Sequence, residues 1–152
     1  MKVSVIGTGL IGSQVIQHLT AAGHAASGHA RSTGLDLSSD PHFRGDPDLP
    51  NPEQLLVLAA SSCQLLSFLA VAARGGVDVV GYEDDAMGEM PDDLVPQRIT
   101  RIVLRPVVVV AHGTQGATVE RMLHLAHDEC YIANSLTTQV LVEPTVRVGP
   151  AG

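Results

Sequence analysis

Two cysteines, Cys63 and Cys130, are the side chains of this chain best suited to covalent chemistry. A cysteine thiolate can attack an electrophile, bind a metal or pair with a second thiol. The chain predicts no export signal, because the apolar stretch after Lys2 is broken by glycines and runs into Gln14 and Gln17. In a cytoplasmic protein, a cysteine pair is more often catalytic, redox-sensing or metal-binding than structural. The alternative interpretation is that both are inert buried side chains, as free cysteines commonly are.

A metal site is a further alternative, because His124, His127 and Cys130 recur three residues apart in a segment predicted to be helical. Neighbouring members of such a series can share a helix face. A structural zinc site needs four ligands, however, and only Cys63 offers itself as the fourth. Histidines on a polar helix face are usually solvated, and we therefore expect no metal site.

A glycine motif, Gly7-Thr8-Gly9-Leu10-Ile11-Gly12, follows a predicted strand at Val3–Ile6 and opens a predicted helix. This is the context of a dinucleotide-binding fingerprint, with Asp36 as the candidate ribose ligand. The leader, residues 1–37, resembles the first βα unit of an NAD(P)-binding Rossmann reductase. A Rossmann domain needs repeated βα units, and the pattern stops after one. We therefore expect no cofactor, and a dinucleotide-binding or non-catalytic hybrid protein is the alternative function.

Cys63 lies in a segment whose sequence predicts a helix with a defined start and end. Asn51 suits an N-cap, Pro52 the first helical position, and Glu53 the positive end of the helix dipole. The helix is predicted to end at Arg74, before Gly75-Gly76. Its apolar residues surround the helix instead of forming a stripe: Leu55, Leu56, Leu58, Leu65, Leu66, Phe68, Leu69 and Val71. A helix of this kind belongs inside a structure, and we expect it to pack between a sheet and a second subunit.

The second cysteine follows a predicted helix at Ala117–Glu129. Cys130 continues the series of apolar residues that marks the buried face of that helix. The turn-rich segment 38–51 is predicted to be a loop. Three strands are predicted from runs of β-branched residues or from alternation, the second with a bend at Pro106: Val77–Met90, Arg98–Ala111 and Gln139–Val148. This order of elements predicts an α+β protein.

Charge and hydropathy exclude several kinds of partner. Nine basic residues stand against sixteen acidic ones, and the net charge is −7. An acidic chain without a basic stripe is not expected to bind nucleic acid or an anionic membrane surface. Residues 55–73 are the one candidate for a membrane span, but Ser61, Ser62, Gln64 and Ser67 interrupt them. We expect a cytoplasmic protein without a membrane segment.

The motifs around the two cysteines resemble the OsmC/Ohr family over about residues 38–148. The resemblance covers the start of the core helix, the long central strand, the second cysteine motif and an upstream loop. Its segments are Asn51-Pro52-Glu53-Gln54-Leu55-Leu56 with Ala59-Ala60-Ser61-Ser62-Cys63, Ile99–Pro106, Ala126–Leu136 and Asp40–Pro47. The resemblance implies an OsmC-like domain at residues 38–152, with long buried helices on curved antiparallel sheets in an intertwined homodimer. The leader stands where the family has a β-hairpin.

The resemblance also implies a function, the reduction of hydroperoxides by a pair of cysteines. Cys63 would be the reactive thiolate and Cys130 the resolving thiol, with Glu53 and Arg44 as the glutamate and arginine of the site. The apolar surroundings of Cys63 favour organic hydroperoxides, and the Ohr branch of the family uses a lipoyl-type thiol reductant. A nearby guanidinium would lower the pKa of the reactive thiol, and the glutamate would hold that guanidinium in place.

Helix geometry places a limit on this site. Ten residues separate Glu53 from Cys63, which is about 15 Å along a straight helix and about 80° around it. Glu53 therefore cannot serve the Cys63 of its own chain. We expect it to reach the partner's site in an antiparallel pairing of these helices.

Overall fold

The computed structural model describes residues 2–6, 25–30 and 35–150. The chain divides into two compact units, residues 1–55 and residues 56–152. The glycine motif at 7–12 and the helix predicted after it lie outside the described residues.

The first unit holds a three-stranded sheet in the order β1-β2-β3, with β1 at Lys2–Ile6, β2 at Ala25–Ala30 and β3 at Leu35–Ser38. β1 and β2 pair in parallel, while β2 and β3 are antiparallel. Asp36, the candidate ribose ligand, lies in β3 opposite His29. A series of βα units gives parallel strands throughout, so the antiparallel β3 departs from the Rossmann pattern.

The segment predicted as a loop contains one short 3₁₀ helix, η1, at Pro41–Phe43. Asp40 caps it by accepting a hydrogen bond from the backbone N–H of His42 at 2.9 Å. The chain leaves η1 through Arg44, whose φ of 64° lies in the left-handed region. A Cβ on the next residue, Gly45, would fall 1.6 Å from the carbonyl oxygen of Ser39, so only glycine fits there.

Helix α2 runs from Pro52 to Arg74, as predicted. Asn51 and Gln54 cap its start reciprocally: the backbone N–H of Gln54 donates to Asn51 Oδ1 at 2.7 Å, and that of Asn51 donates to Gln54 Oε1 at 3.0 Å. At its end, Gly76 adopts a φ of 65°, and the N–H of Val77 donates to the carbonyl of Ala72 at 2.9 Å. This closure is a Schellman motif, in which glycine supplies the left-handed residue.

The second unit is built on three lines of strand, and each line is interrupted once. Its six strands are β4 at Val79–Asp84, β5 at Met87–Glu89, β6 at Arg101–Leu104, β7 at Pro106–Val110, β8 at Gln139–Val142 and β9 at Thr145–Val148. They form two sheets, β4-β7-β9 and β5-β6-β8. The three strands predicted from sequence are therefore found in the right places, but each is divided into two.

The interruption of the central line has a local cause. Pro106 has no backbone N–H to give to a strand ladder. Beside it, the N–H of Arg105 donates to Asp84 Oδ1 at 2.7 Å instead of to a backbone carbonyl. The predicted bend at Pro106 is confirmed as the boundary between β6 and β7.

The sheets are mixed, whereas the expected sheets were antiparallel. β4 and β5 run antiparallel to β7 and β6, but β8 and β9 run parallel to β6 and β7. The parallel pairs follow from the connection: α3 and α4 carry the chain back to the same end of the sheet before β8 begins. The α+β class is confirmed.

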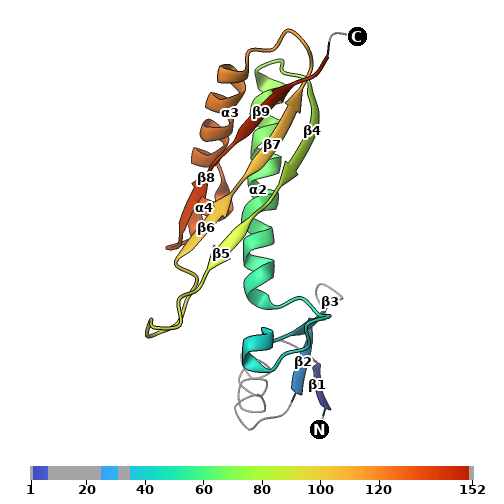
Figure 1. Cartoon of the computed structure of the whole chain (residues 1–152), viewed down its shortest axis with the longest axis vertical. Helices are drawn as coiled ribbons and strands as arrows, with labels where there is room; N and C mark the ends of the chain where they lie inside the picture. The colour runs from blue at the N-terminus through green and yellow to red at the C-terminus, as the bar shows by residue number, and fades with distance from the viewer. Residues whose placement is uncertain (1, 7–24, 31–34, 151–152) are drawn as a thin grey trace. The chain divides into compact units, whose positions relative to one another are not determined.

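Helices α2 and α3 (Gly116–Asp128) lie on one face of the second unit's strands (Figure 1). Two clusters form the core. The first joins both helices to β7: Phe68, Val71, Ala72, Val108, Val110, Val119, Leu123 and Ala126. The second joins α2 to β6, β8 and the segment before β6: Ala60, Ile99, Ile102, Leu104 and Val140. A Cβ on Gly88 would lie 2.7 Å from the side chain of Val57, so α2 approaches β5 closely where that residue is glycine.

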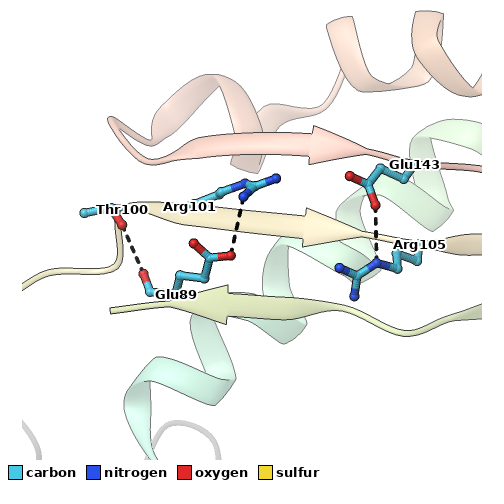
Figure 2. A network of polar contacts seen from close by, with 5 residues as sticks. All are labelled: Glu89, Thr100, Arg101, Arg105 and Glu143. Atoms are coloured by element: carbon cyan, nitrogen blue, oxygen red, sulfur yellow. Dashed lines mark hydrogen bonds and ion pairs between the residues drawn. The ribbon is translucent and has the colours of Figure 1, made fainter. Parts of the chain in front are cut away.

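The opposite face of the strands carries charged pairs (Figure 2). Arg101 of the central strand reaches Glu89 on one neighbouring strand at 3.5 Å, and Arg105 reaches Glu143 on the other side at 3.3 Å. These side chains are half-exposed, so each pair contributes roughly 0–1 kcal/mol. The pairs link adjacent strand lines, but the stability of the unit comes from the buried face.

Helix α2 buries only one stripe of its apolar surface within the chain. Ala60, Gln64, Phe68 and Val71 are buried at helical spacing, whereas Leu58 and Leu66 are exposed by 58% and 67%. By length and composition alone, α2 would also suit a membrane span, a test that the core helix of a soluble protein passes too. The sequence predicted that α2 is buried on all sides. Within this chain, only one side of the helix is buried.

Candidate active site

The structure brings Cys63 and Cys130 together. Cys63 is half-buried in the middle of α2, and Cys130 is 1% exposed at the start of α4, Tyr131–Ser135. The two thiols lie close enough to shift each other's pKa, and they remain unbonded covalently. Far apart in the sequence, they meet as a redox pair must.

The position of Cys130 differs in one respect from the sequence prediction. Val119, Leu123 and Ala126 form the buried face of α3 as expected, but α3 ends at Asp128. Cys130 belongs to the turn that follows and is the N-cap residue of α4. Its backbone N–H donates to the carbonyl of His127 at 3.0 Å, which closes the turn.

Gln64 fixes the two cysteine-bearing segments relative to each other. It follows Cys63 in α2 and is fully buried. Its Nε2 donates to the backbone carbonyl of Leu123 in α3 at 2.9 Å. A buried hydrogen bond of this kind restricts sliding of one helix along the other, and so holds Cys63 beside the turn that presents Cys130.

The surroundings of Cys63 favour its thiolate. Burial acts to raise its pKa, but hydrogen bonds from the backbone N–H of Ile132, the Cys130 thiol, the backbone N–H of Tyr131 and the Ser67 hydroxyl together lower the pKa below the ordinary value. Sequence reasoning predicted a guanidinium in this role. That role stays a prediction; within the described part of this chain, the donors are the first N–H groups of α4, the Ser67 hydroxyl and the Cys130 thiol, of which only Cys130 was a candidate from the sequence.

Cys130 has the opposite tendency. Burial raises its pKa, and so do the hydrogen bond that it donates to Cys63 and the negative charge of Cys63. The backbone N–H groups of Ala133 and Ile132 act in the other direction without reversing the shift. Of the two thiols, Cys63 is therefore the one that loses its proton first as the pH rises.

Arg44 and Glu53 lie in the first unit, whereas both cysteines lie in the second. Glu53 is in the first turn of α2, and Arg44 follows η1. Asp40 ties the two segments together, because its Oδ2 accepts a hydrogen bond from Asn51 Nδ2 at 3.0 Å. In the described part of the chain, no ion pair joins Arg44 to Glu53.

Metal ligands do not cluster in the described residues: no group of three or more His, Cys, Asp or Glu side chains there could hold an ion. Among the candidate ligands, His124 is exposed. His127 has a buried Nδ1 without a hydrogen-bond partner among the described residues.

The fold and the motifs agree with known proteins. The family model described as OsmC-like protein matches residues 45–145. No curated protein matches the chain in sequence. Among solved structures, an OsmC-like protein of unknown function from Vibrio cholerae is 36% identical, with a TM-score of 0.66, over 72% of this chain and 76% of that chain.

Two more distant structures share the fold. An organic hydroperoxide resistance protein OsmC from Legionella pneumophila is 18% identical, with a TM-score of 0.58, over 77% of this chain and 85% of that chain. The organic hydroperoxide resistance protein OhrB of Bacillus subtilis is 17% identical, with a TM-score of 0.56, over 78% of this chain and 87% of that chain. The leader lies outside the residues that the family model matches. With the family model covering most of its length, the chain belongs to the OsmC-like protein family.

Proposed function

We propose that this protein is a thiol-dependent peroxidase that reduces organic hydroperoxides through Cys63 and Cys130. The observation that carries the proposal is that Cys63 and Cys130 are neighbours in the fold, with the pKa of Cys63 lowered and that of Cys130 raised. A two-cysteine peroxidase needs thiols of different acidity. One attacks the peroxide as the thiolate, and the other stays protonated until the disulfide forms. Two proteins of the same fold are organic hydroperoxide resistance proteins, which supports the choice of substrate.

The reaction proceeds in two steps. The Cys63 thiolate attacks the outer oxygen of the hydroperoxide, the O–O bond breaks, and an alcohol leaves once its oxygen is protonated. Cys63 becomes a sulfenic acid. Cys130 then condenses with it, forming a disulfide and releasing water, which protects Cys63 from irreversible oxidation. An external thiol, of the lipoyl type in our proposal, reduces the disulfide and completes the cycle.

Arg44 and Glu53 complete the proposed site from a second subunit. Glu53 would hold the guanidinium of Arg44 beside the partner's Cys63, where a positive charge strengthens the preference for thiolate. The tie between Asp40 and Asn51 supports this assignment, because it keeps the segment of Arg44 at the start of the helix that carries Glu53. The proposal needs a homodimer but no cofactor, metal, nucleic acid or membrane, and places the protein in the cytoplasm.

The experiment is mass spectrometry of the cysteines after a pulse of cumene hydroperoxide. The wild type should form the Cys63–Cys130 disulfide. Cys63→Ser should consume no peroxide, and Cys130→Ser should complete one turnover and then accumulate sulfinic or sulfonic acid at Cys63. Hydrogen peroxide at the same concentration should oxidise the wild type more slowly, because the leucine-rich helix that carries Cys63 should bind an apolar peroxide better.

Two results would contradict the proposal. Over-oxidation of Cys130 in Cys63→Ser, with Cys63 unchanged in Cys130→Ser, would reverse the two roles. A wild type that forms no disulfide with either peroxide would leave the cysteines without peroxidase chemistry.

A further inference from the structure

Gln64 is a polar side chain in the middle of an otherwise apolar contact. It lies on the buried stripe of α2 with Ala60 and Phe68, and it is fully buried. Its Nε2 donates to the Leu123 carbonyl of α3 at 2.9 Å, but its Oε1 has no hydrogen-bond partner among the described residues. A buried polar atom without a partner costs about 1–3 kcal/mol. Methionine has a similar length and would fill this place without that cost, so packing alone does not explain a glutamine here.

The hydrogen bond from Gln64 adds a direction that the surrounding contacts lack. The buried residues of α3 are Val119, Leu123 and Ala126, which are all apolar. Apolar contacts are non-directional, so they allow small shifts of one helix along the other. A hydrogen bond to one backbone carbonyl is made at one position of α3 only, and it is stronger in the protein interior than in water. Gln64 therefore sets the position of α3 along α2.

Both cysteines are attached closely to this bond. Cys63 is the residue before Gln64 in α2. Cys130 lies in the turn that follows α3, and its backbone N–H donates to the carbonyl of His127, in the last turn of that helix, at 3.0 Å. A shift of α3 along α2 would therefore carry Cys130 with it and change its position relative to Cys63.

Disulfide formation tolerates little movement of this kind. The Cβ atoms of a disulfide lie about 3.5–4.5 Å apart, a range narrower than the rise of about 1.5 Å per helical residue. A shift of α3 by one residue would take the two thiols out of this range. The attack of Cys63 on a peroxide needs no bond to Cys130, so the first step of the proposed reaction tolerates such a shift better than the second.

We propose that Gln64 is a positioning residue for the bond between Cys63 and Cys130: its hydrogen bond to α3 keeps the two sulfur atoms at a high effective concentration toward each other. The inference rests on the proposed peroxidase function. In the step concerned, the Cys130 sulfur attacks the Cys63 sulfenic acid, an S–S bond forms and the S–O bond breaks. The hydroxide leaves with the proton of Cys130 as water. Cys130 is oxidised and Cys63 is reduced, and the hydroperoxide of the first step is the oxidant.

Gln64→Met tests the proposal, since it keeps the length of the side chain and removes the donor. Rapid-quench mass spectrometry should show sulfenic acid forming at Cys63 at close to the wild-type rate, with disulfide formation slowed about tenfold or more. Sulfinic acid at Cys63 should then accumulate at peroxide concentrations that the wild type tolerates. Gln64→Leu removes the same donor with a side chain of different shape and should give the same result.

A second measurement needs no peroxide. In equilibrium with reduced and oxidised glutathione, the fraction of protein that holds the Cys63–Cys130 disulfide gives the effective concentration of the two thiols. Gln64→Met should lower this effective concentration about tenfold, which makes the disulfide easier to reduce by about 30 mV. Val71→Ala is the control, because it removes apolar contacts from the same core cluster and leaves the hydrogen bond in place. It should destabilise the protein without changing the potential.

The two measurements separate this inference from the peroxidase proposal. If the wild type forms the disulfide with glutathione but not with a hydroperoxide, the peroxidase proposal fails, and the comparison of Gln64→Met with Val71→Ala still decides the role of Gln64. An unchanged potential in Gln64→Met, an equal shift in Val71→Ala, or a wild type that forms no disulfide with glutathione would overturn the inference.

Discussion

The thiols of Cys63 and Cys130 are neighbours but differ in pKa. The difference comes from their hydrogen-bond partners and from how deeply each is buried. Cys63 receives hydrogen bonds from donors that include the N–H groups of Ile132 and Tyr131. Cys130 is more deeply buried and donates to Cys63. A negative charge is therefore stabilised at the first sulfur and opposed at the second. The pair is asymmetric before any peroxide arrives.

This asymmetry predicts the pH dependence of alkylation. The thiolate fraction of a cysteine grows as the pH rises through its pKa, so a lowered pKa moves the reactive form to lower pH. Cys63 should therefore react with iodoacetamide with a midpoint at lower pH than an ordinary thiol, and Cys130 with a midpoint at higher pH. Peptide mass spectrometry across the pH range measures this.

A matched variant identifies the cause. Ser67→Ala removes one of the donors to Cys63, and should move the midpoint to higher pH without abolishing the reaction. A midpoint for Cys63 at or above that of an ordinary thiol would show that its surroundings do not favour the thiolate.

At the scale of elements, Asp84 joins the helix to the sheet. One oxygen accepts from Ser61 of α2 at 2.6 Å, and the other accepts from the N–H of Arg105, where the central line of strands breaks. The same carboxylate thus takes the place of a ladder carbonyl and holds the turn of α2 that contains Ser61 and Cys63. The apolar core packs helix and sheet together, and the hydrogen bonds of Asp84 fix the position of α2 along the strands.

Asp84→Ala should therefore destabilise the protein by about 2–4 kcal/mol, since two hydrogen bonds to a charged group are lost and the N–H of Arg105 is left without this acceptor. Urea unfolding measures the change. Glu83→Ala is the control, because its side chain is exposed on the neighbouring position of the same strand, and it should change stability by less than about 0.5 kcal/mol. Equal effects of the two substitutions would contradict the role assigned to Asp84.

At the scale of the whole molecule, α2 has more apolar surface than one chain covers. Leu58, Leu66 and Leu69 are exposed by 58%, 67% and 39%. These residues flank the turns of α2 that carry Cys63, so a second copy packed on this side would enclose the proposed site. The proposed shared site requires the same dimer, because Glu53 and Cys63 are about 15 Å apart along one α2.

A complementation experiment tests this shared site. Glu53→Ala and Cys63→Ser subunits, each inactive as a homodimer, should regain roughly half of the wild-type activity when co-expressed, because one of the two sites in a heterodimer keeps both groups. Differently tagged subunits allow the heterodimer to be purified and assayed with cumene hydroperoxide. Heterodimers as inactive as both parents, or a monomer in sedimentation analysis, would refute the shared site.

The sequence by itself determined the features whose signals are local. The start and end of α2 were predictable, because Asn51 and the pair Gly75-Gly76 act on the backbone of their own turns. The bend at Pro106 was predictable because proline lacks a ladder donor. The two cysteines were candidates by residue type alone, since only a thiolate offers this nucleophilicity.

Only the tertiary structure decided the rest, because it depends on contacts between distant segments. The breaks in Val77–Met90 and Gln139–Val148 were missed, since strand-forming residues continue on both sides of each break. The contact between Cys63 and Cys130 arises from the packing of α3 on α2 and the turn that follows. Which of the two thiols has the lower pKa depends on the direction in which the first backbone N–H groups of α4 point. Residue type supplies the chemistry, but a pKa is a property of surroundings that form only when the chain has folded.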